Sequence, residues 1–100
     1  MTEIICVQNN RHFKLMADNH AGSTEVCAGV SALLYALEGT LMNHDSAICH
    51  YSTLEPGHAV IECIAMDELV AEDFRMALIG LMQIREGHPD DIAILQNIFD

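Results

Sequence analysis

The sequence predicts a small α+β domain of two layers, in which two helices pack on one mixed or antiparallel sheet in the order β-β-α-β-β-α. The chain has 100 residues, which suits a single domain spanning residues 1–100. Its residues are 51% hydrophobic and 19% charged, a composition too apolar for a disordered segment. Twice along the chain, two short apolar runs typical of strands are followed by a longer stretch in which apolar residues recur every three or four positions, as on the buried face of a helix.

The first two strands are predicted at Glu3–Val7 and Arg11–Met16. The first run is dense in Ile and Val, and the second alternates polar with apolar residues. Asn9 and Asn10 lie between them, and asparagine tolerates the left-handed backbone of a tight turn. We therefore expect a hairpin.

A helix is predicted from about Thr24 to Leu41. Ser23 or Thr24 stands where an N-cap is expected. The apolar residues that follow share one stripe of a helix: Val26, Val30, Leu33, Leu34, Leu37 and Leu41.

A second hairpin is predicted from Ile48–Leu54 and Ala59–Ala65. These extended runs are separated by residues 55–58, whose Pro56-Gly57 pair is a strong turn signal.

The second helix is predicted to begin at an Asp67 cap and to end at Gly87 and Pro89. The tail Asp91–Phe99 still carries apolar residues, so we expect either a short edge strand or cover from a partner subunit. The acids near the start of this helix suit the positive end of its dipole, and we expect them to be solvated: Glu68, Glu72 and Asp73.

Composition excludes some partners. Fifteen acidic residues against four basic ones give a formal charge of −11, which repels phosphate and opposes direct binding of nucleic acid. The apolar runs fall short of the ~18 residues of a membrane span, and residues 1–10 show no secretion signal, so we expect a cytoplasmic protein. A two-layer domain of this size leaves apolar surface uncovered, which predicts a homodimer.

The segment between the first hairpin and the first helix carries the most chemistry. It places His20 at the end of a strand and Cys27 in the first turn of a helix. The thiolate is the nucleophilic form of cysteine, and both a helix N-terminus and a neighbouring imidazolium favour it. With Gly22 and Ser23 available for a bend, the spacing permits a Cys-His dyad without requiring one. The alternative is a buried cysteine that only packs, beside a solvated histidine.

The same helix end offers a place for an oxyanion. The first N–H groups of a helix have no partner within it. We expect those of Cys27 and Ala28 to face the oxygen of a tetrahedral intermediate.

The other cysteines are weaker candidates. Cys6 and Cys63 lie in extended apolar runs and are expected in the core. Cys49 and His50 are adjacent in a strand, so their side chains point to opposite faces. No C-x-x-C pair occurs, so we expect neither a metal nor another cofactor. The faint alternative is a metal site drawn from His44, Cys49, His50, His58 and Cys63.

The string His20-Ala21, followed by a short loop and by VCAGVSAL at Val26–Leu33, resembles the signature of the ribosomal-processing cysteine proteases, the Prp family. The resemblance covers nearly the whole chain. It implies an endopeptidase that trims the N-terminal extension of a large-subunit ribosomal protein, with Cys27 as nucleophile and His20 as general base. It also implies a supporting role for Ser31 and a homodimer. An acidic domain suits a basic ribosomal-protein tail as its peptide partner.

Two features differ from the family's pattern. Only six residues separate His20 from Cys27, where the family has a longer glycine-containing loop. Thr24 stands where the family tends to carry an aspartate; we expect Thr24 and the loop residue Gly22 to support the site. The choice of a third, orienting residue is open between Glu25, Asp18 and none.

The differences leave two functions to distinguish. One is an active cysteine protease. The other is a catalytically inactive dimeric module of the same fold, which binds a peptide or protein in the groove between the second strand and the first helix.

Overall fold

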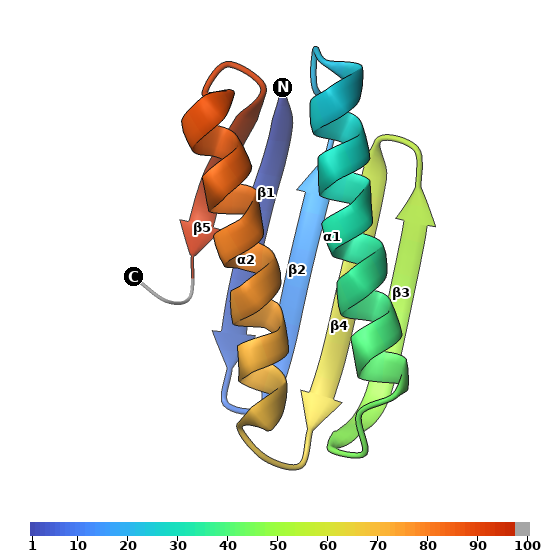
Figure 1. The fold of residues 1–100 in the computed structure, drawn as a ribbon. Coiled ribbons are helices and arrows are strands. Elements are labelled where there is room, and N and C mark those ends of the chain that lie inside the picture. Colours follow the sequence, from blue (N-terminus) through green and yellow to red (C-terminus); the bar gives the residue numbers. More distant parts are fainter. Residues whose placement is uncertain (98–100) are drawn as a thin grey trace.

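One mixed sheet of five strands carries both helices on a single face (Figure 1). The structure is a computed structural model that describes residues 1–97, apart from the side chain of Cys49. The elements follow in the order β1 (Thr2–Asn9), β2 (His12–Asp18), α1 (Thr24–Met42), β3 (Ala47–Glu55), β4 (His58–Ala65), α2 (Leu69–Gly87) and β5 (Ile92–Asn97). The predicted α+β class, its two layers and its order of elements are confirmed.

The sheet has the strand order β3-β4-β2-β1-β5. Strands β1 and β2 form the predicted hairpin, but Asn9 still pairs with His12, so the turn lies one residue later than expected, at Asn10 and Arg11. Asn10 has the left-handed φ of 57° that such a turn needs. The antiparallel pairs of β2 with β4 and of β4 with β3 complete this side of the sheet.

The tail forms an edge strand, which is one of the two outcomes expected from the sequence. Strand β5 pairs in parallel with β1, from Thr2 opposite Ile92 to Cys6 opposite Asn97. The predicted tail also included Ile98 and Phe99, which lie outside the described residues.

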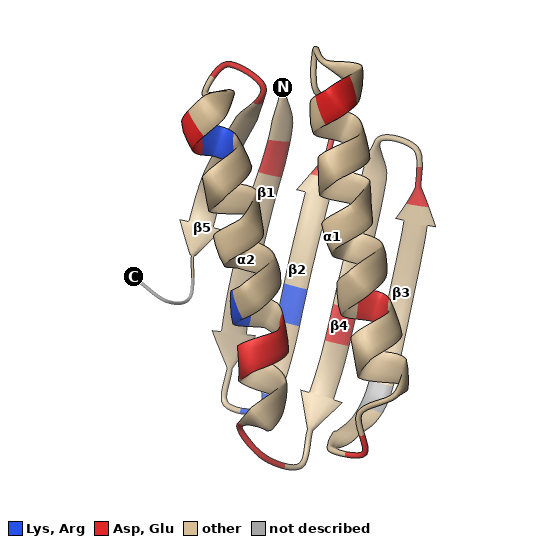
Figure 2. Ribbon diagram, viewed as in Figure 1, with Lys and Arg blue, Asp and Glu red and all other residues tan. Residues whose placement is uncertain are grey.

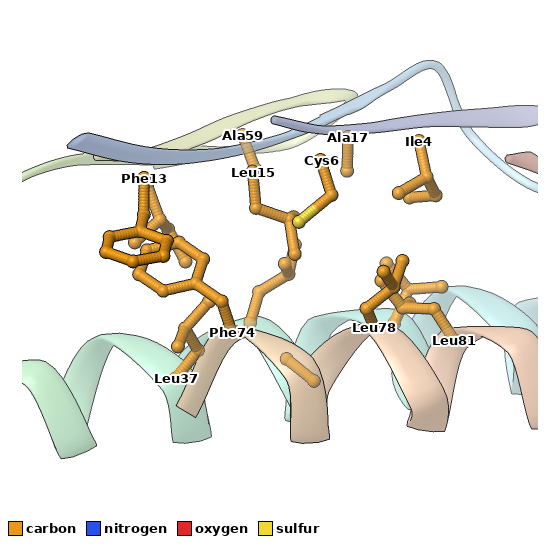
Figure 3. Packing of buried hydrophobic residues seen from close by; sticks show 14 of the residues in the cluster. Ile4, Cys6, Phe13, Leu15, Ala17, Leu37, Ala59, Phe74, Leu78 and Leu81 are labelled. Carbon is orange, nitrogen blue, oxygen red and sulfur yellow. The ribbon is translucent and has the colours of Figure 1, made fainter. Parts of the chain in front are cut away.

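The core lies between the sheet and the helices (Figure 3). Alternate residues of β1 and β2 point to the helices and are buried, among them Ile4, Cys6 and Leu15. The Phe13 ring of β2 stacks on the Phe74 ring of α2, with centroids 5.4 Å apart. Cys6 and Cys63 are both buried, as the sequence predicts.

Helix α1 is unusually apolar for a helix at the surface of a domain. Glu25 and Glu38 are its only charged residues, and no basic side chain lies on it (Figure 2). By length and composition α1 could cross a membrane; in this structure its buried stripe packs on the sheet. It also packs closely against α2, since a Cβ added at Gly80 would lie 2.8 Å from Leu33 Cδ2.

Helix α2 begins two residues after Asp67, whose Oδ1 accepts a hydrogen bond from Leu69 N at 2.9 Å. Ser46 Oγ donates to Asp67 Oδ2 at 2.8 Å, and these two bonds lower the pKa of Asp67. The expectation of a fully solvated acidic face is wrong for Asp73. Its side chain is only 17% exposed and its Oδ2 is buried 3.8 Å from His44 Nε2, because α2 turns it toward the connection that precedes β3. Burial raises the pKa of Asp73.

Candidate active site

A cleft of about 440 Å³ lies between the N-terminal half of α1 and the turn from β3 to β4. The start of α1, the end of β2 and this turn all lie at one end of the sheet (Figure 1). The cleft is lined in part by His20, Thr24, Cys27, Ser31, Tyr35 and Gly57. The two residues of the predicted dyad thus share one cavity.

The N-cap of α1 determines the position of Cys27. Ser23 has extended backbone, with φ −114° and ψ 132°, and its Oγ accepts a hydrogen bond from Val26 N at 3.4 Å. Cys27 therefore lies in the first turn, near the positive end of the helix. Its partly exposed side chain turns back toward the preceding loop, where Sγ donates to the carbonyl of Ala21 at 3.6 Å.

His20 follows the end of β2, where Asn19 has a left-handed φ of 72° and turns the chain. The N–H of Asn19 donates to the carbonyl of Gly57 at 2.8 Å, which ties this bend to the β3–β4 turn. The imidazole lies against that turn, since a Cβ added at Gly57 would be 3.0 Å from His20 Nε2. Within residues 1–97, no hydrogen bond joins the His20 ring to Cys27 Sγ. The structure brings the pair into one cleft without a hydrogen bond between them.

The expected oxyanion donors are corrected by the structure. The N–H of Cys27 donates to the carbonyl of Ser23 at 3.1 Å, so it is a satisfied helical donor rather than a free one. Ala28 lies one residue deeper in the helix, where N–H groups bond to carbonyls four residues earlier. In the described part of the chain, the N–H groups without a partner at this end are those of Thr24 and Glu25.

The supporting residues divide into two groups. Thr24 and Ser31 line the cleft, whereas Gly22 does not. The N–H of Gly22 donates instead to Asp91 Oδ1 at 3.2 Å, so this glycine ties the loop to the segment before β5. Ser31 is one turn beyond Cys27 on α1 and is exposed.

Neither carboxylate considered for the orienting role is hydrogen-bonded to His20. Asp18 Oδ1 lies 2.5 Å from His58 Nδ1, its direct neighbour across β2 and β4. Glu25 is exposed in the first turn of α1. Among the described residues, no carboxylate is hydrogen-bonded to the His20 ring.

Sequence reasoning missed the second wall of the cleft, which the β3–β4 turn provides. Of the residues that the structure describes, Glu55 is the one carboxylate in the lining, and no lysine or arginine contributes to it. The Pro56-Gly57 signal predicted the turn itself but not its position beside His20, which depends on the pairing of β2 with β4. No group of three His, Cys, Asp or Glu side chains within the described residues could hold a metal ion. The lining includes the thiol of Cys27 and the imidazoles of His20 and His58.

The chain matches no protein-family model, and a sequence search against curated proteins finds no match. Solved structures do match. The ribosomal processing protease Prp from S. aureus, in complex with a covalently linked product peptide, has a TM-score of 0.83 and 20% identity over 97% of this chain and 100% of that chain. The same protease with a substrate peptide has a TM-score of 0.76 and 18% identity, with the same coverage.

SMU.848 from Streptococcus mutans also matches, with a TM-score of 0.71 and 22% identity over 97% of this chain and 96% of that chain. These matches extend over nearly the full length of each protein. The protein therefore has the fold of the ribosomal processing protease Prp, as its sequence resemblance implied.

Proposed function

We propose that this protein is a cysteine endopeptidase in which Cys27 is the nucleophile and His20 the general base. The observation that carries the proposal is that both side chains line one cleft, with Cys27 in the first turn of α1. The positive end of the helix favours the thiolate there. The S. aureus protease of the same fold is described with a substrate peptide and with a covalently linked product peptide, which supports a peptide as the ligand.

The reaction follows the usual course of thiol proteases. Cys27 gives up its hydrogen bond to the Ala21 carbonyl, and His20 accepts the thiol proton. The sulfur attacks the scissile carbonyl carbon and forms a tetrahedral oxyanion. As the C–N bond breaks, the leaving amine takes the proton from His20 and a thioester remains on Cys27. Water, deprotonated by His20, then hydrolyses the thioester and restores the free thiol.

The oxyanion needs donors other than the N–H of Cys27, which is held within the helix. Thr24 lines the cleft and its N–H has no partner among residues 1–97, so we assign it this role. Removal of one such donor costs on the order of 100-fold in rate in comparable enzymes. Ser31 supports the site from the next turn of α1.

The substrate we propose is the basic N-terminal extension of a large-subunit ribosomal protein, trimmed during ribosome assembly. A chain with a formal charge of −11 attracts a basic tail and speeds its encounter. The same charge disfavours direct binding of nucleic acid. We place the protein in the cytoplasm and propose that it acts as a homodimer.

The test is cleavage of a library of internally quenched peptides, with products identified by mass spectrometry. The wild-type protein should cleave a subset, whereas Cys27→Ala and His20→Ala should cleave none above background. Thermal unfolding of both variants should match that of the wild type, since neither side chain lies in the core. Turnover by Cys27→Ala would exclude the proposed nucleophile.

A second candidate function is a peptide-binding module without catalysis. It is favoured by one observation, that Cys27 Sγ is hydrogen-bonded to the Ala21 carbonyl rather than to His20. In that case wild-type protein and Cys27→Ala should bind the same library peptides with equal affinity, and neither should cleave them.

A further inference from the structure

The turn between β3 and β4 contains Gly57, whose backbone conformation and close neighbours both favour glycine. Gly57 has a φ of +76°, a conformation that residues with a Cβ rarely adopt. The position is also tight for a side chain, because a Cβ there would lie 3.0 Å from His20 Nε2 and 3.3 Å from His20 Cδ2. The imidazole would have to move by a few tenths of an ångström to make room for it.

Hydrogen bonds fix the backbone at Asn19 and His20. A side chain added at position 57 would therefore move the His20 ring rather than its backbone. The N-terminal amine of Met1 donates to the carbonyl of His20 at 3.2 Å, and Thr2 Oγ1 donates to the carbonyl of Asn19 at 3.0 Å. The N–H of Asn19 donates to the carbonyl of Gly57 at 2.8 Å. Strand β1 and the β3–β4 turn thus fix the bend that carries His20.

The same strand ends are also held by a side-chain pair. Asp18 and His58 lie directly opposite each other in the register of β2 and β4, and their side chains are 2.5 Å apart. Asp18 lies two residues before His20, and His58 directly follows Gly57. The distance between the bend and the turn is therefore set by the sheet itself.

We propose that Gly57 is a positioning residue for His20: the bare backbone of the β3–β4 turn gives the imidazole its place at the wall of the cleft that it shares with Cys27. The inference rests on the proposed function, because it assigns Gly57 a role through the general base. A Cβ at position 57 moves the ring from this wall by a few tenths of an ångström. A misplacement of about 1 Å can lower a rate by about 100-fold, so this smaller shift is expected to lower it by a smaller factor.

The test is a double-mutant cycle on the rate at which iodoacetamide alkylates Cys27 at about pH 6, where an unactivated thiol reacts slowly. Peptide mapping assigns the modified cysteine, and no substrate is needed. His20→Ala should slow the reaction at least tenfold, and Gly57→Ala should slow it by a smaller but measurable factor. The double variant should be no slower than His20→Ala alone, because Gly57 acts through the ring.

Two further sets of variants separate the contact from the strain. Gly57→Asn adds a Cβ, yet asparagine tolerates a positive φ, so it should slow alkylation as Gly57→Ala does. Gly39→Ala and Gly87→Ala are matched controls, since a Cβ at either glycine meets nothing within 4 Å. Both controls should react at the wild-type rate.

Each result has a distinct meaning. If His20→Ala slows alkylation and Gly57→Ala and Gly57→Asn do not, the inference is wrong and the proposed function stands. If Gly57→Ala still slows the reaction in the His20→Ala background, Gly57 acts through the turn and not through the ring, which also overturns the inference. If His20→Ala reacts as fast as the wild type, the proposed function fails first.

A measurement on the unmodified protein covers the case in which the Gly57 variants do not fold. A nuclear Overhauser effect between the His20 ring protons and the Gly57 Hα protons is expected in the wild type. Its absence would contradict the placement on which the inference depends.

Discussion

Two cysteines of this protein show how position decides the behaviour of a thiol. Cys6 is wholly buried in β1, and burial raises its pKa to about 12, so it stays protonated and inert. Cys27 is partly exposed in the first turn of α1, in the cleft that it shares with His20. The difference follows from a strand position in the first case and a helix start in the second, both of which the sequence pattern predicts.

The incorrect prediction of the oxyanion donors shows a limit of sequence patterns at the residue scale. The pattern allowed either Ser23 or Thr24 as the cap of α1, and the choice decides which N–H groups are free. With Thr24 as the cap, Cys27 would be the third helical residue and its N–H would have no carbonyl partner within the helix. Because Ser23 is the cap, the N–H of Cys27 already bonds to the Ser23 carbonyl. A shift of one residue is smaller than the uncertainty of a helix boundary.

Asp73 gives a prediction that depends on pH. Its pKa is raised, chiefly by burial, so the unfolded chain holds its proton less tightly than the folded protein does. The contribution of this group to stability is therefore fully present below the unfolded pKa and is lost as the pH rises through the folded one. Asp73→Asn should raise the melting temperature at neutral pH, and the gain should shrink below about pH 4.

The measurement is thermal unfolding of the wild type and of Asp73→Asn across this pH range. Glu72→Gln is the matched control, because Glu72 is an exposed acid of the same helix. A gain that is constant with pH would show that burial of the charge is not the cause.

At the scale of elements, both hairpins and both helices could be predicted. Which strand of one hairpin pairs with which strand of the other could not. Either strand of the second hairpin could have joined the first. The observed pairing of β4 with β2 brings His58 opposite Asp18 and so puts the β3–β4 turn beside His20. Strand pairing over long stretches of sequence is set by the packing of the whole sheet, which local patterns do not encode. The second wall of the cleft was therefore not predictable.

The Ser23 cap fixes where α1 begins and so places Cys27 in its first turn. Ser23→Ala should destabilise the protein by about 1 kcal/mol, because the N–H of Val26 loses its partner. Ser23→Asp should preserve most of the stability, since a carboxylate also caps a helix. Urea denaturation of both variants measures the difference. Equal loss in both would mean that the hydroxyl acts by packing rather than as a cap.

At the scale of the molecule, one stacked pair of rings joins the two layers. Phe13 and Phe74 are at most 1% exposed and stack across the core. Phe74→Ala should lower the free energy of unfolding by about 3–5 kcal/mol. Met76→Ala on the exposed side of the same helix should change it by less than about 0.5 kcal/mol. Similar losses in the two variants, measured by urea denaturation, would contradict this description of the core.

The uncovered face of the sheet bears on the predicted homodimer. Ile64 and Tyr51 are 46% and 58% exposed, and the alternation of β4 places them on the face opposite the helices. Apolar residues of this size favour association with a second copy. Sedimentation equilibrium at micromolar concentration should give twice the chain mass of 11.0 kDa. A single species of 11.0 kDa would contradict the dimer.

The most direct test of the central claim, that His20 activates Cys27, is the pH profile of Cys27 alkylation between about pH 5 and 9. N-acetylcysteine serves as the free-thiol reference. The wild-type protein should react far faster than this reference at the acidic end of the range, and His20→Ala should lie much closer to the reference, because only the helix N-terminus then favours the thiolate. If wild-type Cys27 tracks the free thiol and His20→Ala has the same profile, then the cleft holds a cysteine and a histidine that do not work together.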